Sequence, residues 1–220
     1  MTVLRTIIFA NGVLSPDTPV HEILEPGDLI LAADGGARHC LAWGINPALV
    51  IGDFDSLSTA DLNRLKESGA EFVRHPTRKD HTDLELALAH ASARGSDEFL
   101  ILGGLGGRLD HSAGALLLLA SDEWSGLPIR LVDGLQSAQI LRGGEILSLQ
   151  GQPGDTVSLL PLTGDARGIT TSGLEYPLRN ETLRFGSTRG ISNSLLEETG
   201  EIQMEEGMLL VVTVQVRDGV

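Results

Sequence analysis

The segment GDFDS at 52–56 carries two carboxylates whose spacing suits a hard metal ion. Asp53 and Asp55 lie two residues apart, directly after the apolar run LVI, which predicts a strand that ends in an acidic turn. Two carboxylates in such a turn can converge on one Mg²⁺, an ion that proteins typically hold through one or two carboxylates together with substrate phosphates. The alternative is a polar turn in which Asp55 caps the next helix.

The segment KDHTD at 79–83 offers a second acidic group, in which Lys79 stands beside Asp80 and Asp83. Asp80 and Asp83 are three positions apart, so at the start of the predicted helix that follows they can lie on one side. Helix capping competes with metal binding here as well, because Thr82 or Asp80 can serve as the N-cap residue.

The segment GGLGGRLDH at 103–111 has four glycines in five positions, which free the backbone to approach phosphate oxygens. These glycines are Gly103, Gly104, Gly106 and Gly107. Arg108 supplies a fork suited to phosphate, and Asp110 lies near the start of a predicted helix whose N-terminus favours anions. The segment lacks the Gly-Lys-Ser/Thr ending of a P-loop. A purely structural glycine turn is the alternative.

A fourth turn, ADGGA at 33–37, repeats the order of strand, Asp, Gly, Gly and helix. Gly35 and Gly36 permit close approach of a ligand, and Asp34 can accept from a ribose hydroxyl or contact the surroundings of a metal. A tight strand-to-helix turn explains the same residues. Because all four turns follow predicted parallel strands, we expect them to line one crevice, and their carboxylates, glycines and basic side chains indicate Mg²⁺–nucleotide chemistry.

Strand-like and helix-like segments alternate through roughly the first 130 residues, which predicts a mostly parallel, Rossmann-like α/β sheet. The predicted strands are 6–10, 29–33, 49–51, 72–74 and 98–102. The predicted helices are 37–43, 60–68, 82–94 and 111–120. This order places each of the four turns at the carboxyl end of a strand or just before a helix.

The pattern changes after Asp133, where the segments become short and rich in β-forming residues. The predicted strands of this second part are 138–141, 146–149, 156–160 and 209–216. Clusters of Gly, Pro, Asn and Asp separate them, which favours an antiparallel sandwich or small barrel. We therefore expect an α/β domain at 1–133 and an all-β sandwich domain at 137–220.

The composition excludes several classes of protein. The chain has 220 residues, of which 41% are hydrophobic, so it can bury a substantial core and is not disordered. Its 30 acidic residues against 16 basic ones give a formal net charge of −14. That charge argues against binding to nucleic acid, which needs a basic face, and against adsorption to an anionic membrane.

The single cysteine, Cys40, cannot form an internal disulfide and is interpreted as a small buried hydrophobic residue in a reducing compartment. No secretory signal is visible in the first 15 residues. The longest strongly apolar stretch, 113–120, is too short for a bilayer span of about 20 residues. We therefore expect a cytoplasmic protein.

Taken in order, four segments of the first half resemble the motifs of the thiamine pyrophosphokinase (thiamine diphosphokinase) family. They are ADGGA at 33–37, PALVIGDFDSLS at 47–58, KDHTDLELAL at 79–88 and GGRLDH at 106–111. Two later segments, GITTSGLEYPL at 168–178 and RGISNSL at 189–195, resemble that family's β-domain motifs. The resemblance spans nearly the whole chain, and GDFDS, KDxTD and GGRxDH are specific as a set.

The resemblance implies an enzyme that binds ATP and Mg²⁺ in its first domain and thiamine in its second. The family reaction moves the β,γ-pyrophosphoryl group of ATP onto the hydroxyethyl oxygen of thiamine and releases AMP. Such chemistry depends on charge neutralisation and in-line placement of the reacting groups. The resemblance also implies a homodimer with active sites between the subunits.

Carried onto this sequence, the family mechanism assigns Mg²⁺ to Asp53, Asp55 and Asp80, with Asp83 and Asp110 beside the metal. One of Asp80 or Asp83 helps to accept the hydroxyl proton of thiamine, although the metal can make a strong base unnecessary. These six side chains, the five carboxylates and Arg108, are the predicted catalytic set.

The remaining assignments concern the two substrates. Arg108, Lys79 and the backbone of 103–107 are expected to contact the phosphates, and Asp34, Gly35 and Gly36 the rest of the nucleotide. Ser192 and Asn193 are expected to hydrogen-bond the aminopyrimidine of thiamine, and Tyr176 to pack on it.

One departure from the family pattern is visible, because the segment SAGA at 112–115 lacks an asparagine that often follows the Asp-His pair. Two alternatives stay open. A pyrophosphokinase for another alcohol, such as a hydroxymethyl pterin, would keep the metal and phosphate turns. A non-catalytic sensor of nucleotide or thiamine diphosphate would be expected to lose the metal carboxylates, which this sequence retains.

Overall fold

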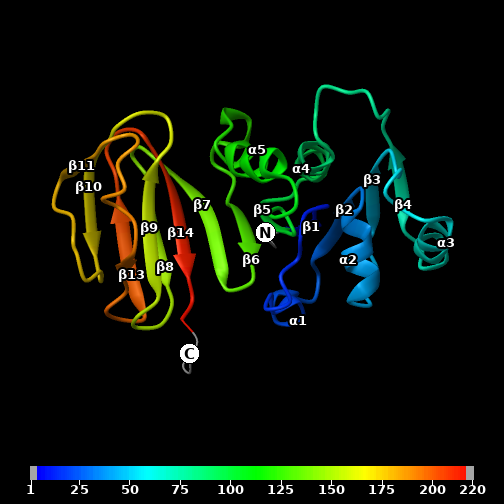
Figure 1. Cartoon of the computed structure of the whole chain (residues 1–220), viewed down its shortest axis with the longest axis horizontal. Coiled ribbons are helices and arrows are strands. Elements are labelled where there is room, and N and C mark those ends of the chain that lie inside the picture. Colours follow the sequence, from blue (N-terminus) through cyan, green and yellow to red (C-terminus); the bar gives the residue numbers. More distant parts are fainter. Residues whose placement is uncertain (1–3, 217–220) are drawn as a thin grey trace. The chain divides into compact units, whose positions relative to one another are not determined.

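The first part of the chain forms six parallel strands, which pair in the order β4 (Glu71–Arg74), β3 (Leu49–Gly52), β2 (Leu29–Ala33), β1 (Arg5–Phe9), β5 (Glu98–Leu102) and β6 (Ile129–Asp133). This computed structural model describes residues 4–216 and divides into two compact units, the first reaching Gly134 and the second beginning at Leu135 (Figure 1). All six strands belong to the first unit. The α/β class predicted for this part is confirmed.

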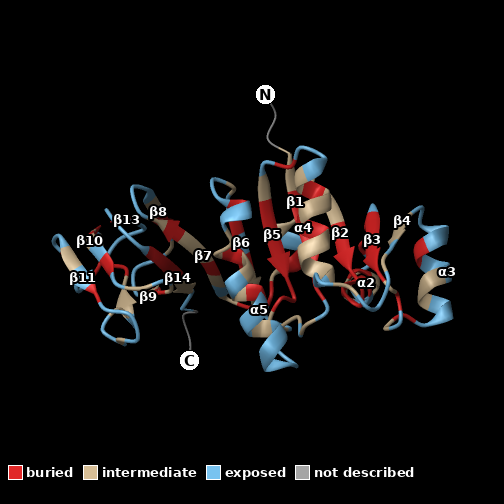
Figure 2. Cartoon of the chain, turned by 90° about the horizontal axis from the view of Figure 1, so that it is seen from above, coloured by how far each residue is buried: buried red, intermediate tan, exposed pale blue. Residues whose placement is uncertain are grey.

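Helices connect these strands and cover their apolar side chains. They are α1 (Val20–Ile23), α2 (Gly36–Ala42), α3 (Thr59–Glu67), α4 (Asp83–Ala93), α5 (Leu109–Leu119) and the 3₁₀ turn η1 (Asp122–Trp124). Most residues of strands β1, β2, β3 and β5 are buried, and none is exposed (Figure 2). Continuous apolar runs of this kind are typical of parallel strands that are covered on both faces.

Cys40 lies in this core on α2, fully buried, and burial raises the pKa of its thiol to about 12. The interpretation of Cys40 as a buried hydrophobic residue is confirmed. A thiol with so high a pKa is a poor nucleophile at neutral pH.

Strand β6 is absent from the sequence prediction. Its five residues, IRLVD, include two charged side chains, and Arg130 is exposed. Its pairing with β5, in which Leu131 lies opposite Ile101, adds it to the parallel sheet. A run this short does not reveal its partner, so the sequence pattern alone could not distinguish it from the start of the β-rich part.

The second unit consists of antiparallel strands that form a sandwich. They are β7 (Gln136–Arg142), β8 (Ile146–Gln150), β9 (Thr156–Pro161), β10 (Ala166–Ser172), β11 (Glu181–Leu183), β12 (Asn193–Ser194), β13 (Thr199–Gln203) and β14 (Met208–Val214). Four of them pair in the order β12-β9-β14-β7 and the other four in the order β11-β10-β13-β8. Side chains from both sheets, such as Val157, Ile169 and Ile202, share one apolar core, as a sandwich requires. The all-β class predicted for this part is confirmed.

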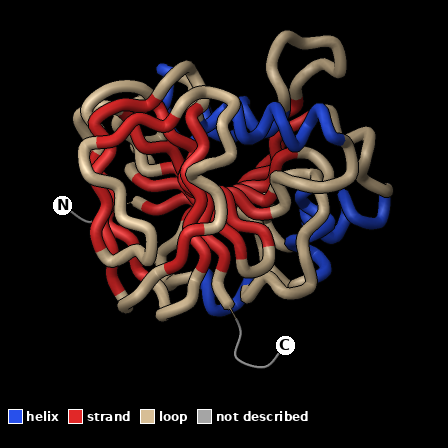
Figure 3. Tube along the Cα trace, turned by 60° about the vertical axis from the view of Figure 1, so that its left-hand side comes forward, coloured by secondary structure: helices blue, strands red, loops and turns tan. Residues whose placement is uncertain are grey.

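Among the described residues, every helix belongs to the first unit, and the second contains strands and loops alone (Figure 3). Strands β10 and β13 are absent from the sequence prediction. Their sequences, ARGITTS and TGEIQ, contain glycine and charged residues, and β13 buries only Ile202. Such strands are recognised by their partners in the sheet more than by their own pattern.

Candidate active site

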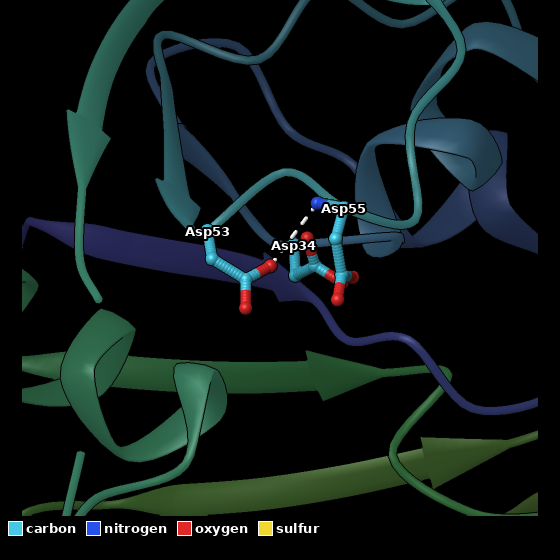
Figure 4. A group of neighbouring side chains, drawn as sticks. All are labelled: Asp34, Asp53 and Asp55. Carbon is cyan, nitrogen blue, oxygen red and sulfur yellow. Dashed lines mark hydrogen bonds between the residues drawn. The ribbon is translucent and has the colours of Figure 1, made fainter. Parts of the chain in front are cut away.

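Three carboxylates meet at the carboxyl ends of two neighbouring parallel strands. Asp34 directly follows β2, and Asp53 and Asp55 follow β3. One oxygen of each side chain lies within 4.8 Å of the corresponding oxygens of the other two (Figure 4). Because β2 and β3 are parallel and adjacent, their ends open at the same edge of the sheet, which is where ligands bind in α/β proteins.

Asp34 is the buried member of this acidic cluster, with 5% of its surface exposed. Its Oδ2 accepts a hydrogen bond from Asn11 Nδ2 at 3.2 Å, whereas its buried Oδ1 has no hydrogen-bond partner within residues 4–216. An unpaired carboxylate oxygen that is shielded from water is costly unless a charge compensates it. The Oδ1 atom of Asp34 therefore fits a cation ligand.

Asp53 and Asp55 influence each other in opposite directions. The backbone N–H of Asp55 donates to Asp53 Oδ1 at 3.1 Å, and this bond is the main reason that the pKa of Asp53 is lowered. The pKa of Asp55 is raised, chiefly by the charge of Asp53 and further by burial and by the charges of Asp34 and Asp83. Carboxylates that repel one another in this way bind a cation with relief of that repulsion.

Phe54 fixes the turn between these two aspartates. Its backbone has φ of +67°, an uncommon conformation for a bulky residue, and its side chain is buried. The ring packs edge-to-face on Phe72 of β4, and the Arg74 guanidinium lies 4.8 Å from the ring centroid. Because Phe54 points into the protein, the acidic side chains on either side of it are held at the strand end.

Gly52 brings a fourth carboxylate next to the cluster. A Cβ atom at Gly52 would lie 2.9 Å from the Cβ of Asp34 and 3.2 Å from Asp83 Oδ1, and the glycine has φ of +152°. Asp83, the first residue of α4, therefore lies close to Asp34 across this glycine. Its Oδ1 also accepts from Lys79 Nζ at 2.5 Å.

Helix capping accounts for Thr82 of the second acidic motif, as one alternative predicted, but not for the aspartates of either motif. Ser58 caps α3, where it accepts from the backbone N–H of Asp61 in a capping box, and Thr82 caps α4 by accepting from Glu85. Asp55 and Asp80 are therefore not the N-cap residues of those helices. Asp80 is exposed in the loop before α4 and lies outside the group formed by Asp34, Asp53 and Asp55.

Most glycines of the segment 103–107 have packing roles. A Cβ at Gly103 would meet the Ala10 carbonyl oxygen at 2.9 Å, one at Gly104 would meet Leu131, and one at Gly106 would meet Val13 at 2.7 Å. Only Gly107 has open space around the position of a Cβ. The backbone near Gly107 is therefore the part of the loop that is free to approach a ligand.

The loop after β1 and the glycine segment are joined by backbone hydrogen bonds. Gly12 N donates to Gly103 O and Val13 N to Leu105 O, both at 2.7 Å. Ser112 closes the other side, because its Oγ accepts from Gly106 N at 3.0 Å and donates to Arg108 O at 3.2 Å. Ser112 is not among the site residues predicted from the sequence. Its position at a helix start, four residues after Arg108, is the only sequence feature that indicates such a contact.

Arg108 and Asp110 pair with each other on the surface. The Nε and Nη2 atoms of Arg108 donate to the two carboxylate oxygens of Asp110, and both side chains are more than 60% exposed. The hydrogen bond from Arg108 lowers the pKa of Asp110 to about 2. An ion pair this exposed contributes little to stability, so Arg108 can exchange Asp110 for another anion.

Gly35 and Gly36 are both buried beneath neighbouring groups. A Cβ at Gly35 would lie 2.0 Å from Asn11 Oδ1, and one at Gly36 would lie 1.9 Å from the Phe9 carbonyl oxygen. Their lack of a side chain is thus explained by close packing of the protein on itself. Contact of these glycines with a nucleotide stays a prediction.

In the second unit, the structure joins Tyr176 to Asn193, the residue that follows Ser192 in the chain. Asn193 Oδ1 accepts from the backbone N–H of Tyr176 at 3.0 Å, and Asn193 Nδ2 donates to the Tyr176 carbonyl at 2.8 Å. Ser192 has φ of +62°, and its N–H donates to Ser158 Oγ. Tyr176 as a whole residue is 64% exposed. The Asn193 amide thus mainly holds the Tyr176 loop, and within residues 4–216 one of its two N–H groups has no hydrogen-bond acceptor.

Comparison with known proteins gives two consecutive family matches. Residues 20–131 match the family described as "Thiamin pyrophosphokinase, catalytic domain", and residues 145–209 match "Thiamin pyrophosphokinase, vitamin B1 binding domain". Thiamine pyrophosphokinase from Bacillus subtilis is 32% identical over 184 residues, which cover 84% of this chain and 86% of that protein.

Solved structures agree with these matches. The crystal structure of thiamine pyrophosphokinase from Bacillus subtilis superposes with a TM-score of 0.87 at 29% identity, covering 97% of this chain and 100% of the other. The enzyme from Geobacillus thermodenitrificans superposes with a TM-score of 0.85 at 26% identity, covering 99% of this chain and 100% of the other.

Proposed function

The chain belongs to the thiamine pyrophosphokinase family, and from that membership we propose how its residues act. It is a transferase that moves pyrophosphate from ATP to the hydroxyl group of thiamine, giving thiamine diphosphate and AMP. The observation that carries this function is the match of both family domains in order along one chain. The relatives give no support to a hydroxymethyl pterin as the substrate.

We propose Mg²⁺ as the metal of this enzyme, held by Asp34, Asp53 and Asp55. Hard carboxylate oxygens suit this ion, and the unpartnered Oδ1 of Asp34 together with the mutual repulsion at Asp55 supports a cation in this place. When bound, Mg²⁺ neutralises charge on the transferring phosphates. Asp34 thus joins Asp53 and Asp55, two of the three metal ligands predicted from the sequence. The third, Asp80, lies outside this group in the loop before α4, and its contact with the metal stays a proposal.

Proton transfer from the thiamine hydroxyl is proposed to involve Asp80 or Asp83. Asp83 lies beside the acidic cluster across Gly52, and Lys79 occupies its Oδ1. Because Lys79 already donates to Asp83, whereas the Asp80 side chain is exposed, Asp80 is the better placed of the two to meet the thiamine hydroxyl. Asp83 and Lys79 then act mainly in orienting the loop before α4.

The phosphates of ATP are proposed to lie against Gly107 and Arg108. The backbone at Gly107 faces open space, and Arg108 is held by an exposed partner, Asp110, which it can release. Arg108 would then donate its fork of N–H groups to phosphate oxygens. The other three glycines support this loop from behind through their packing.

Thiamine is proposed to bind in the second unit, with Tyr176 packing on the aminopyrimidine and Ser192 hydrogen-bonding it. The match of residues 145–209 to the vitamin B1 binding domain supports this division of labour. Asn193 fixes the Tyr176 loop and offers its remaining N–H to the ring. We also propose, from the family resemblance, that the protein works as a homodimer in the cytoplasm. Among the described residues, no helix is both long and apolar enough to span a bilayer.

The decisive experiment measures AMP and thiamine diphosphate after incubation with ATP, Mg²⁺ and thiamine. Asp55→Ala and Asp80→Ala should each lower turnover by about 100-fold or more, because charge neutralisation and proton transfer contribute several kcal/mol to the reaction. Glu67→Gln on the exposed end of α3 is the matched control and should keep full activity. Near-normal turnover of both Asp variants would disprove the proposed metal and base assignments.

A further inference from the structure

Asn11 lies in the loop after β1, outside every motif that the sequence singles out, and yet it contacts the acidic cluster. Its Nδ2 donates to Asp34 Oδ2 at 3.2 Å. On its other side, Arg38 Nη2 of α2 donates to Asn11 Oδ1 at 3.0 Å. One amide therefore links the buried carboxylate of the cluster to a guanidinium.

The chemistry of the two partners determines how the Asn11 amide is turned. The Asp34 carboxylate can only accept and the Arg38 guanidinium can only donate, so the NH₂ end must face Asp34 and the oxygen must face Arg38. A flipped amide would place two acceptors together and two donors together. Asp34 and Arg38 together therefore determine that the Asn11 NH₂ group faces Asp34 Oδ2.

The backbone around Asn11 is held on both sides. Ala10 N donates to Leu102 O at 2.8 Å, Gly12 N donates to Gly103 O at 2.7 Å, and the His39 ring nitrogen Nε2 lies 2.9 Å from Gly12 O. Gly35 provides the space for the side chain, since a Cβ there would lie 2.0 Å from Asn11 Oδ1 and 2.7 Å from Nδ2. Asn11 therefore occupies a site shaped to receive its amide.

We propose that Asn11 is a positioning residue for the Asp34 carboxylate. By holding Oδ2, it fixes the rotation of a carboxylate that has one oxygen within 4.8 Å of Asp53 and Asp55 and whose buried Oδ1 is unpartnered among the described residues. Asn11 acts through Asp34 and does not itself bind the ion. The inference rests on the proposed function, because it takes Asp34 as a cation ligand.

The test measures binding of Mn²⁺ alone to the nucleotide-free protein by electron paramagnetic resonance, so that no turnover is needed. Asn11→Ala should weaken Mn²⁺ binding by about 10-fold. This is the lower end of the loss in metal affinity that follows when the hydrogen-bond partner of a metal ligand is removed. Asp34→Asn should weaken it at least as much. Asn63→Ala, an exposed asparagine on α3, is the matched control and should bind Mn²⁺ like the unaltered protein.

The double variant Asn11→Ala/Asp34→Asn shows whether Asn11 affects Mn²⁺ binding through Asp34 or independently of it. If Asn11 acts only through Asp34, the double variant should bind Mn²⁺ no more weakly than Asp34→Asn alone. Losses that add would show that Asn11 acts independently, and the proposal would be wrong. Circular dichroism checks that each variant is folded, and Asn11→Ser, which cannot bridge both partners, replaces Asn11→Ala if that variant does not fold.

Two further outcomes separate this inference from the proposed function. If Asp34→Asn weakens Mn²⁺ binding and Asn11→Ala does not, the role of Asn11 is disproved while the metal site stands. If Asp34→Asn binds Mn²⁺ as tightly as the unaltered protein, Asp34 is not a ligand, and both the proposed metal set and the role of Asn11 are overturned.

Discussion

The aspartates that follow the strands of the first unit differ in what surrounds them, although they look alike in the sequence. Asp34 is buried with one free oxygen, and Asp53 is stabilised in its charged form by a backbone N–H. Asp55 is made harder to ionise by its neighbours, whereas Asp110 is paired with Arg108. Asp34, Asp53 and Asp55 therefore suit a cation, whereas Asp110 pairs with Arg108, the residue proposed to bind phosphate.

From the Arg108–Asp110 pair we predict how the pKa of Asp110 depends on Arg108. Arg108→Gln should raise the pKa of Asp110 from about 2 toward the ordinary value of 3.8, because the hydrogen bond from Arg108 is the main cause of the shift. A ¹³C NMR titration of the Asp110 carboxyl group in metal-free protein measures this change.

The sign of the linked stability follows from the lowered pKa. Asp110 favours folding above pH 3.8, and this contribution is lost as the pH falls toward 2, where the folded protein binds the proton as well. The effect on stability should be small, because both side chains are exposed. An Asp110 midpoint that is the same with and without Arg108 would contradict the pairing in solution.

At the scale of elements, the glycine segment 103–107 shows that one composition can serve two purposes. Gly103, Gly104 and Gly106 allow the loop to pack on the β1 loop and on β6, and Gly107 leaves its backbone open. A glycine-rich turn therefore does not by itself identify phosphate-binding atoms. The position of each missing Cβ does, because it distinguishes packing from access.

Substituting two neighbouring glycines tests this distinction. Both have positive φ, +80° at Gly106 and +71° at Gly107, so alanine should cost about 1–2 kcal/mol of backbone strain at either position. Only the methyl group at Gly106 would clash with Val13. Gly106→Ala should therefore lower the free energy of unfolding in urea more than Gly107→Ala does.

The KM for ATP tests the proposed role of the second glycine of this pair, Gly107. If the backbone at Gly107 contacts phosphate, Gly107→Ala should raise the KM for ATP more than that for thiamine. Equal losses of stability in the two variants would contradict the packing role of Gly106, and an unchanged KM for ATP in Gly107→Ala would contradict the phosphate contact.

At the scale of the whole molecule, two hydrophobic cores support two kinds of site. One core lies within the first unit and includes Ile7, Val50 and Leu65, whereas the other lies within the second unit and includes Val157 and Ile202. The acidic cluster is attached to strands of the first core. A defect in the second core should therefore leave the cluster unchanged as long as the protein stays folded.

A pair of core substitutions tests this independence. Ile202→Ala in the second unit and Val50→Ala in β3 both remove fully buried side-chain atoms and should lower the free energy of unfolding by about 1–5 kcal/mol. Only Val50→Ala, in the strand that precedes Asp53, should also weaken Mn²⁺ binding. Weaker Mn²⁺ binding in folded Ile202→Ala would show that the cluster depends on the second unit.

The net charge of −14 is a property of the whole molecule that now has a partial explanation. Asp34, Asp53, Asp55 and Asp83 lie close together in the first unit, where a cation is proposed. ATP is itself an anion, so a bound divalent cation would convert local repulsion into attraction. The exclusion of nucleic-acid and membrane partners by this charge stays a prediction.

Much of this protein followed from the sequence alone, since apolar runs and their spacing determine the α/β and all-β classes and ordered motifs determine the family. The strand ends also placed Asp34, Asp53 and Asp55 near one another, because parallel strands open at a common edge. The structure decided between the cap candidates, since Ser58 and Thr82 rather than Asp55 and Asp80 are the caps. Tertiary structure alone decided that Gly35 makes room for Asn11 and that Asn193 holds the Tyr176 loop. The physical reason is that periodicity and composition report on each residue's own segment. A tertiary hydrogen bond or close approach joins residues that are far apart in the chain, as Asn11 and Asp34 are, and exists only once the fold has brought them together.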